Sequence, residues 1–346
     1  MKVAVAGAGV VGLSTAYCLA EKFRSIGVSV TVIADAFSPN TSSDKAGALI
    51  WPLLLGSSSH RRAKYDAQLQ QWTVDTFKHL HSLYHTNEAA EIQLSLESGY
   101  QFVPNTAEPP WWKDLVLGFR CISADSNEVQ RFVQTHQSHR SMSVWAFSTY
   151  LVDCRLYLPW LMAGFMRRGG MVEQRRLKSL DELRGYDVVV NCTGLGAAEL
   201  VGDHDLHPVR GQAVLVRAPW IKHFVIDVDD SKEDWVYVFP RSCDVLLGGT
   251  AVSGDWSETV DPATSEAILS RCTALLPSLR GAEVIGAWVG GRPVRTTVRL
   301  EKEERGPGWP LMIHNYGHGG QGIVLHWGCA LEVANMLEQF ILRSHL

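Results

Sequence analysis

Hydrophobic and polar positions near the N-terminus follow a strand–helix–strand pattern. Lys2–Ala6 is a short apolar run, which is typical of a buried strand. From Val11 to Lys22 the apolar residues recur with the spacing of one helix face. Val28–Ala34 is again a nearly continuous apolar run, and Asp35 follows it directly. The pattern therefore predicts a βαβ unit.

The turn between the first strand and the helix carries Gly7, Gly9 and Gly12, the spacing of a dinucleotide-binding turn. Glycine permits the tight turn, lets a pyrophosphate approach the helix N-terminus, and allows the helix to pack closely on the strand. The Asp35 carboxylate can accept a hydrogen bond from a ribose hydroxyl. Its charge disfavours the extra phosphate of NADP, which leaves FAD or NAD.

A stretch of small polar residues, Ser38–Ala48, comes next. It is either a linker or a loop that contacts the phosphates or the flavin of a cofactor. Hydroxyl groups supply hydrogen-bond donors, and the smallest side chains permit close approach. The residues in question are Thr41, Ser42, Ser43, Gly47 and Ala48.

Farther along, Arg62–His81 and Tyr157–Arg168 have helical periodicity, and Glu91–Val103 alternates like a strand. Asp187–Asn191 is a continuous apolar run, typical of a central parallel strand. It ends in the tight loop 192–196, the kind of place where open α/β sheets bind ligands. From Pro208 onward strands prevail, and the acidic segment Asp227–Asp234 is expected to be a loop. The predicted strands of this part are Gln212–Arg217, Trp235–Phe239, Val245–Leu247 and Val294–Leu300.

A second glycine-rich segment lies near the C-terminus, where four glycines fall within the six residues 317–322 and an apolar, helix-like run follows. Glycine weakens helices and strands, so this density indicates a backbone that approaches something large and flat. Two such segments at opposite ends of the chain suggest one cofactor held by both. The nearby His314, His318 and His326 have no carboxylate or thiolate at ligand spacing, so we interpret them as core residues, or as residues that support a site from behind, rather than as metal ligands.

Composition narrows the functional classes. The chain has 346 residues, of which 46% are hydrophobic and 20% charged, with a net charge of −4. This balance favours neither nucleic acid nor an anionic membrane as a partner. The seven cysteines include no CxxC pair, which argues against a zinc ribbon or a disulfide framework and fits a reducing compartment. No apolar run reaches the length of a membrane helix, and the N-terminus does not have the pattern of a signal peptide.

Two residues are candidates for substrate binding. Arg292 follows two glycines and precedes Pro293, so it is either a surface ion-pair residue or a planar partner for a substrate carboxylate. Tyr237, on an apolar run, is either a core residue or a second donor to that carboxylate. The sequence shows no organised nucleophile, and we therefore expect the chemistry to belong to a cofactor.

Together these segments closely resemble the D-amino-acid oxidase and D-aspartate oxidase family of FAD enzymes, nearly from end to end. The segments that carry the resemblance are Val3–Tyr17, Trp112–Arg120, Val190–Gly194, Pro208–Gln212, Leu246–Gly249, Gly291–Arg295 and His314–Ala330. The resemblance implies an α/β fold with two discontinuous domains. A Rossmann-like FAD-binding domain (1–51, 153–206 and 294–346) is interwoven with a β-rich substrate-binding domain (52–152 and 207–293).

The resemblance also implies a mechanism. A D-amino acid lies over the flavin and loses its α-hydrogen as hydride to N5, the imino acid hydrolyses, and dioxygen reoxidises the flavin to give hydrogen peroxide. Arg292 would pair with the substrate carboxylate, Tyr237 would donate to it, and the Gly320 carbonyl would accept from the amine. The expected FAD-binding residues are Gly7, Gly9, Val10, Val11, Gly12, Asp35, Thr41, Ser42, Ser43, Gly47, Ala48, Leu49, Leu177, Cys192, Thr193, Gly194, Gly319, Gly320, Gly322, Ile323 and Val324.

The chain departs from the family pattern at three positions near the expected site: Glu233 replaces a tyrosine, Val324 a threonine, and Trp51 a glutamine. Trp51 is expected to crowd or reshape the pocket. Val324 removes a hydroxyl contact to the flavin, which shifts cofactor retention toward the N-terminal turn and Asp35.

Substrate preference follows from two missing cations. Arginines expected in D-aspartate oxidases are replaced by Ile226 and Ala251, and an unpaired buried carboxylate is costly. The prediction is therefore a neutral or basic D-amino acid, and the acidic loop Asp227–Asp234 could favour D-arginine or D-lysine. Arg241 is a replacement cation that keeps D-aspartate open.

The remaining expectations concern location and alternatives. The tail Ser344-His345-Leu346 resembles a peroxisomal address read by an import receptor, and the protein is expected to be cytoplasmic if that tail is not used. A D-amino acid and dioxygen are the expected small-molecule partners, and a homodimer is an open expectation. The competing functions are an NAD-dependent dehydrogenase and a non-enzymatic binding module.

Overall fold

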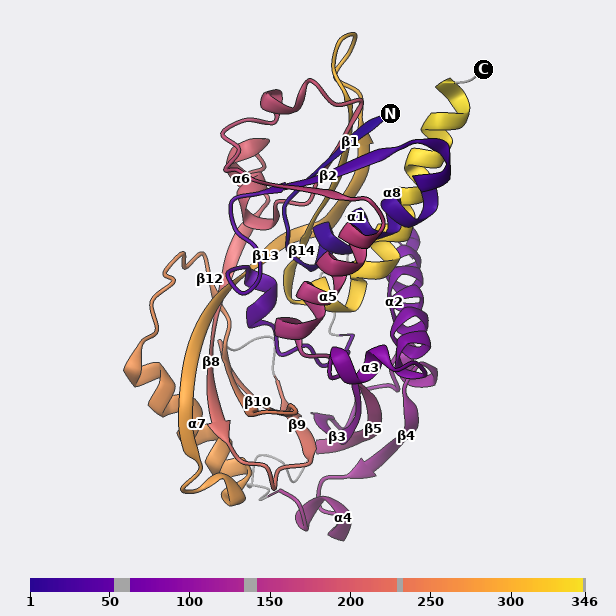
Figure 1. Cartoon of the computed structure of the whole chain (residues 1–346). Helices are drawn as coiled ribbons and strands as arrows, with labels where there is room; N and C mark the ends of the chain where they lie inside the picture. Colours follow the sequence, from indigo (N-terminus) through magenta and orange to yellow (C-terminus); the bar gives the residue numbers. More distant parts are fainter. Residues whose placement is uncertain (53–62, 134–141, 229–232, 345–346) are drawn as a thin grey trace.

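The computed structural model describes residues 1–52, 63–133, 142–228 and 233–344 (Figure 1). A single sheet extends through this part of the chain, in the strand order β4-β5-β3-β9-β10-β11-β8-β13-β14-β7-β1-β2-β6, with β12 paired to β8. The strands are β1 Lys2–Ala6, β2 Ser29–Ala34, β3 Ser95–Pro104, β4 Leu117–Ser123, β5 Met142–Leu151, β6 Met171–Gln174, β7 Val188–Asn191, β8 His207–Arg217, β9 His223–Asp227, β10 Asp234–Pro240, β11 Val245–Thr250, β12 Val252–Ser253, β13 Glu283–Glu303 and β14 Leu311–His318. The helices are α1 Val10–Phe23, α2 Ala63–Tyr84, α3 Glu88–Glu91, α4 Asn127–Gln130, α5 Cys154–Arg167, α6 Ala197–Leu200, α7 Pro262–Leu275 and α8 Gly322–Ser344.

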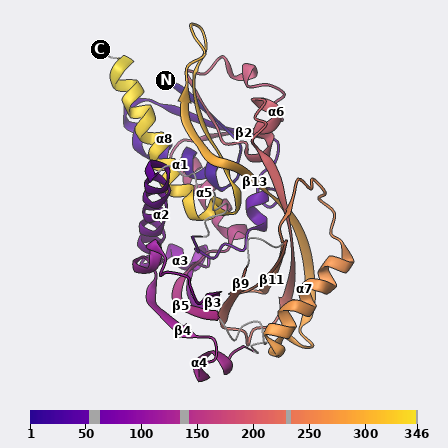
Figure 2. The same cartoon turned by 180° about the vertical axis from the view of Figure 1, so that it is seen from behind.

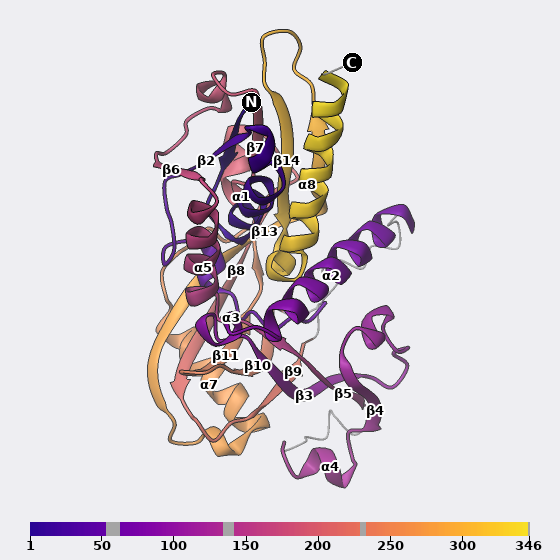
Figure 3. The same cartoon turned by 45° about the vertical axis from the view of Figure 1, so that its right-hand side comes forward.

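The nucleotide-binding half is a parallel sheet. Strands β14, β7, β1, β2 and β6 are parallel to their neighbours in that order, and β1, α1 and β2 form the predicted βαβ unit. Helix α1 packs between α5 and α8, as Figure 3 shows, so this face of the sheet is covered by helices. On the opposite face, Leu180 and Leu183 of a short 3-10 segment cover Ala4 and Ala6. The α/β fold class with a Rossmann-like unit is confirmed.

The second half is mainly antiparallel. Strands β9, β10, β11, β8 and β13 lie side by side in this order, and each is antiparallel to its neighbours. Helix α7 packs against β8, β10 and β11, and Figure 2 shows it lying along that end of the molecule. Together they enclose a second apolar core.

Strand β13 joins the two halves. It pairs with β8 from Glu283 to Val294 and then with β14 from Val294 onward. The predicted strand Val294–Leu300 is thus only a part of a 21-residue strand. The domain boundary drawn between residues 293 and 294 falls inside β13, and the boundaries stay predictions.

Several expectations about local structure were wrong in detail. The strand predicted at Glu91 begins only at Ser95, because Glu88–Glu91 is a helical turn and Gln93 has a φ of 48°. Arg175 and Arg176 directly follow strand β6.

The acidic segment Asp227–Asp234 connects β9 to β10, and its residues 229–232 lie outside the described residues, as do residues 345–346 of the tail.

A buried charge cluster, made of Asp153, Arg155, Arg241 and Asp244, anchors the start of α5. Asp153 caps α5 by accepting from the backbone N–H and the Nε–H of Arg155, at 3.0 and 2.9 Å. Arg155 also donates to Asp244 at 3.0 Å, and Arg241 donates to Asp244 at 2.7 Å. Burial alone raises the pKa of Asp153, but the hydrogen bonds and charges of Arg155 and Arg241 outweigh it and lower the pKa below its usual range.

We predict that Asp153→Asn lowers the free energy of unfolding at pH 7 by about 1–3 kcal/mol, because it removes the charge and keeps a capping side chain. The folded-state pKa of Asp153 is depressed, so its contribution is present above an ordinary aspartate pKa and is lost as pH falls. The difference between variant and wild type should therefore shrink below about pH 4. Urea unfolding at pH 7 and pH 4 measures both values.

The control is Glu128→Gln, which breaks the exposed pair with Arg120 and should cost less than about 1 kcal/mol. An Asp153→Asn effect that is as small as this control, or that does not change with pH, would contradict the prediction.

Candidate functional site

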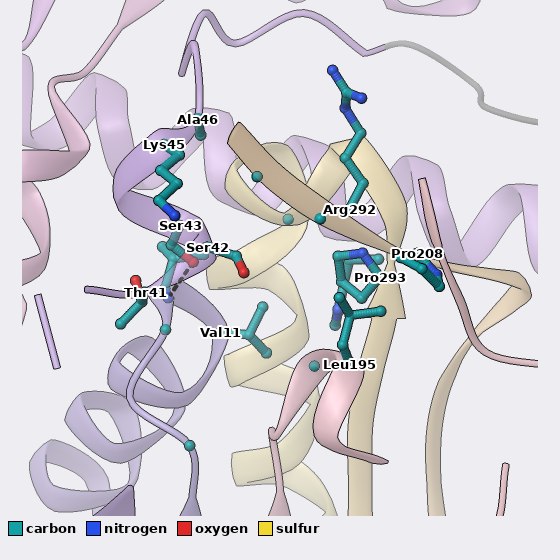
Figure 4. A pocket seen from close by; sticks show the side chains of 18 of the residues that line it. Val11, Thr41, Ser42, Ser43, Lys45, Ala46, Leu195, Pro208, Arg292 and Pro293 are labelled. Carbon is teal, nitrogen blue, oxygen red and sulfur yellow. Dashed lines mark hydrogen bonds between the residues drawn. The ribbon is translucent and has the colours of Figure 1, made fainter. Parts of the chain in front are cut away.

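The carboxyl ends of the parallel strands open into one cavity of about 620 Å3. The turn after β1 (Gly7–Val11), the loop after β7 (192–196) and the segment after β14 (Gly319–Val324) all line it. The two glycine-rich segments at opposite ends of the chain therefore meet in one place, as the sequence indicated. Figure 4 looks into this cavity, with Thr41–Ala46 on one wall and Arg292 and Pro293 on another.

The turn after β1 depends on missing side chains. Gly7 has a φ of 106°, and a Cβ on it would lie 2.4 Å from the Cys192 carbonyl oxygen. A Cβ on Gly12 would lie 2.0 Å from the Gly7 carbonyl oxygen. Gly12 does not line the cavity, and its missing side chain lets α1 pack closely on the turn, while its cofactor contact stays a prediction.

The N-terminus of α1 faces the cavity without a side-chain cap on Gly9. The Val10 N–H donates to Ser43 Oγ at 3.0 Å, which ties the turn to the hydroxyl-rich segment. A helix N-terminus with its N–H groups directed at a cavity favours an anion such as a pyrophosphate.

Of the two interpretations of Ser38–Ala48, the structure favours the loop over the linker. Thr41 donates to the buried Asp44 carboxylate from its backbone N–H at 2.9 Å and from its hydroxyl at 2.7 Å. These bonds close a 3-10 turn, η2 (Ser42–Lys45), of which Ser42, Ser43 and Lys45 line the cavity. Asp44, which the sequence did not single out, thus shapes the wall.

The far end of the cavity suits a ribose. Asp35 is exposed at the end of β2 and lines the cavity with Arg175, Arg176 and Leu177. Arg175 is held by Glu173 at 2.7 Å and by Glu182 at 2.9 Å. Among the described residues no side chain pairs with the Asp35 carboxylate, and its contact to a ribose hydroxyl stays a prediction.

Two buried polar atoms on the cavity wall have no hydrogen-bond partner among the described residues: Asn315 Oδ1 and His318 Nε2. Such atoms are rare because leaving them unpaired is costly. Burial and the neighbouring His326 lower the pKa of His318 to about 3, so its ring is neutral at physiological pH. A bound polar group in the cavity would satisfy both atoms.

Arg292 and Tyr237 lie together at the other end, where glycines make room for them. A Cβ on Gly211 would lie 2.5 Å from Arg292 Nη1, and a Cβ on Gly248 would lie 1.8 Å from Tyr237 Cζ. Arg292 donates to the Thr250 carbonyl at 3.0 Å and stacks over Trp235, 5.0 Å from the ring centroid. Within the described part of the chain Arg292 forms no ion pair with a carboxylate, which argues against the surface ion-pair interpretation.

The Tyr237 phenol is a hydrogen-bond donor at physiological pH. Burial raises its pKa above the usual value, although the Arg292 charge acts in the opposite direction. The hydroxyl therefore keeps its proton beside a fixed cation. This pair is suited to a carboxylate, which can accept from both groups.

Aromatic side chains complete this end of the cavity, and the sequence missed most of them. Trp51 lines it and donates from its indole N–H to Gln101 at 2.9 Å, while Trp235, Phe239 and Trp288 contribute further rings. They come from β10 and β13, which are distant in the sequence. Alternating apolar residues on β10 were the one available signal.

The cations considered for a second substrate carboxylate do not reach the cavity. Ile226 and Ala251, the two positions without the expected arginines, do not line it, and the substrate preference drawn from them stays a prediction. Arg241 does not line it either, because it is buried and paired with Asp244. Glu233 also lies off the cavity wall, and its carbonyl accepts from the Ala251 N–H at 2.8 Å.

The other predicted residues all line the cavity. They are Gly9, Val10, Val11, Ser42, Gly47, Ala48, Leu49, Cys192, Thr193, Gly194, Gly319, Gly320, Gly322, Ile323 and Val324. Their individual contacts to a cofactor stay predictions.

The remaining histidines are core residues. His326 donates from Nδ1 to the Ile323 carbonyl at 2.6 Å and accepts at Nε2 from the Tyr157 hydroxyl at 2.9 Å. His314 is buried beside Glu303 at 2.8 Å. Over the described ranges, no three residues of the metal-ligating types form a cluster, and no helix is long and apolar enough to span a membrane.

Comparison with known proteins identifies the family. The FAD dependent oxidoreductase family, DAO, matches residues 2–336. The chain belongs to this family. A D-aspartate oxidase from Homo sapiens is 40% identical over 98% of this chain and 95% of its own length. A D-amino-acid oxidase from Rubrobacter xylanophilus is 38% identical over 95% of this chain and 94% of its own length.

Solved structures support the fold of this FAD-dependent oxidoreductase. The glycine oxidase from Geobacillus kaustophilus superposes with a TM-score of 0.77 at 20% identity, covering 97% of this chain and 94% of that one. The cofactor of the family fits the cavity described above. The α1 N-terminus and η2 would hold the pyrophosphate, Asp35 the ribose, and Gly319–Val324 with the unpaired atoms of Asn315 and His318 the remaining polar groups.

We predict that Gly7→Ala destabilises the protein by about 2 kcal/mol or more and lowers its FAD content, because the added methyl collides with the Cys192 carbonyl at a left-handed φ. Thermal unfolding followed by circular dichroism and the flavin-to-protein absorbance ratio measure the two effects.

Gly185→Ala is the matched control, since a Cβ there meets nothing within 4 Å. The prediction fails if Gly7→Ala behaves like this control.

Proposed function

We propose that the protein oxidises D-amino acids to 2-oxo acids with release of ammonia and hydrogen peroxide. The observation that carries the proposal is the Arg292–Tyr237 pair, which shares one cavity with the cofactor-binding turns. Relatives named D-amino-acid oxidase, at 31–38% identity over nearly the full chain, support it.

The protein's own residues position the substrate. Arg292 pairs with the α-carboxylate through its planar fork, and the neutral Tyr237 phenol donates to the same group. The Gly320 carbonyl accepts from the amine, which sets the orientation of the α-carbon. The aromatic wall excludes water from this end of the cavity. When bound, FAD supplies the two-electron acceptor, and dioxygen restores it with formation of hydrogen peroxide.

We further propose a preference for neutral or basic side chains. The substrate end includes the rings of Trp51, Trp235, Phe239 and Trp288. Arg292 is engaged by the α-carboxylate, and Arg210, which also lines the cavity, is paired with Asp255. A second carboxylate would lose its hydration among aromatic rings without a partner. A cationic side chain, in contrast, is attracted by aromatic faces. Oxidation of D-aspartate stays the alternative, supported by the D-aspartate oxidase relative from Homo sapiens.

We predict that kcat/KM for D-alanine or D-arginine exceeds that for D-aspartate by about tenfold or more, since an unpaired carboxylate costs at least about 1–2 kcal/mol. Peroxide release measured over a panel of D-amino acids, with the L-enantiomers as controls, gives these ratios. A tenfold preference for D-aspartate would reverse the substrate assignment.

Arg292→Leu serves as the matched site variant. It should bind FAD normally and lose about 100-fold in kcat/KM, the loss of one charge-assisted pair. An FAD-loaded protein without peroxide release on any D-amino acid would instead favour a binding module, and a protein that takes up NAD but not FAD would favour the dehydrogenase.

We also propose that Ser344-His345-Leu346 directs the protein to peroxisomes through the import receptor, where catalase would remove the peroxide. A fluorescent protein fused to the N-terminus of the full chain should colocalise with a peroxisomal marker. Deletion of the tripeptide should leave the fusion in the cytosol, and His345→Lys should keep the import. An unchanged distribution after deletion would refute the signal.

A homodimer stays a prediction that sedimentation of the holoenzyme tests.

A further inference from the structure

Lys45 is a charged residue on the cofactor wall that the sequence gave no reason to select. It ends η2, is half-buried, and lines the cavity between Ser43 and Gly47. Its stem rests against β13, since a Cβ on Gly290 would lie 3.4 Å from Lys45 Cβ. The stem is therefore confined between η2 and β13, and the ammonium group must extend along the cavity.

The side chain points toward the phosphate-binding end. Figure 4 shows Lys45 extending toward Ser43, whereas the Arg292 guanidinium extends in the opposite direction. Ser43 accepts from the first N–H of α1, so this direction leads toward the α1 N-terminus. Lys45 and Arg292 thus serve different ends of the cavity.

The Lys45 charge is not neutralised by the protein. Among the described residues, no carboxylate forms an ion pair with it, and both oxygens of the adjacent Asp44 are taken by Ser38 and Thr41. Two other cavity cations are engaged elsewhere: Arg175 by its two glutamates, and Arg210 by Asp255 at 3.5 Å. A half-buried lysine on a binding wall, without a protein partner, calls for an anionic ligand.

We propose that the Lys45 ammonium pairs with the pyrophosphate of FAD. The α1 N-terminus and the η2 hydroxyls supply partial charges, and Lys45 adds a full positive charge beside them. It thereby offsets the hydroxyl contact that Val324 cannot make. This inference rests on the FAD cavity and not on which amino acid is oxidised.

The test compares Lys45→Met, which keeps the length of the stem and removes the charge, with Lys45→Arg. Holoenzyme is diluted stepwise, and release of FAD is followed by the rise in flavin fluorescence at low and high salt. Lys45→Met should raise the Kd for FAD about tenfold at low salt and by less at high salt, as expected of one charge-assisted contact. Lys45→Arg should stay within about threefold of wild type.

ADP locates the contact, because it carries a pyrophosphate and no flavin. ADP added to holoenzyme displaces FAD by occupying the phosphate end, and Lys45→Met should weaken ADP binding by the same factor as FAD binding. If the Kd for FAD rises and the Kd for ADP does not, Lys45 faces the flavin and the proposal is wrong.

The exposed Lys113→Met is the control for loss of a lysine charge, and it should leave both constants unchanged. Lys45→Met with unchanged FAD and ADP binding overturns the proposal. So does a variant whose only defect is a higher KM for D-aspartate, because Lys45 would then bind a substrate carboxylate. If the wild type does not oxidise D-amino acids, the proposed function is wrong. The Kd values for FAD and ADP would still test whether Lys45 binds the pyrophosphate.

Discussion

The close contact between the turn after β1 and the end of β7 is the constraint on which the site depends. The backbone of Gly7 approaches the Cys192 carbonyl so closely that no side chain fits between them, and Gly12, in the first turn of α1, likewise leaves no room for a side chain against the Gly7 carbonyl. The contact directs the N–H groups of α1 at the cavity and places the loop after β7 beside them. Ser43 then fastens η2 to the same helix end through Val10. The α1 N-terminus, the loop after β7 and η2 are therefore all positioned by this contact.

The two ends of the cavity handle charge differently. At the phosphate end, backbone N–H groups, hydroxyls and Lys45 surround a place for negative charge. At the substrate end, Arg292 and the neutral Tyr237 phenol stand among aromatic rings, which under the proposed function suits one carboxylate and disfavours a second. The separation explains how one cavity can hold a doubly charged cofactor and still discriminate among amino acid side chains.

Local patterns predicted the parts of the site that local geometry controls. The turn Gly7–Gly12, the carboxylate of Asp35 and the C-terminal glycines could be identified because each needs a particular residue type at a particular spacing. Lys45, Trp288 and the unpaired atom of His318 could not, because their roles arise only when β13, β14 and η2 meet in space. Arg241 illustrates the opposite case. The sequence offered it as a cation for a second substrate carboxylate, but in the fold its charge is paired with Asp244. The length of β13 could not be predicted for the same reason, because it depends on pairing first with β8 and then with β14 rather than on the pattern of its own residues.

The continuous strand β13 also fixes the spacing between the cofactor wall at Lys45 and the position of Arg292. A side chain on Gly290 would meet the stem of Lys45, and Arg292, two residues later, lies on the same face of the strand. Their separation along the strand is about 6.6 Å, twice the rise per residue, and it is maintained by covalent geometry. Any hinge between the halves would have to bend this strand. If Arg292 binds the substrate carboxylate as proposed, its backbone therefore keeps a fixed position relative to the η2 wall of the cofactor cavity.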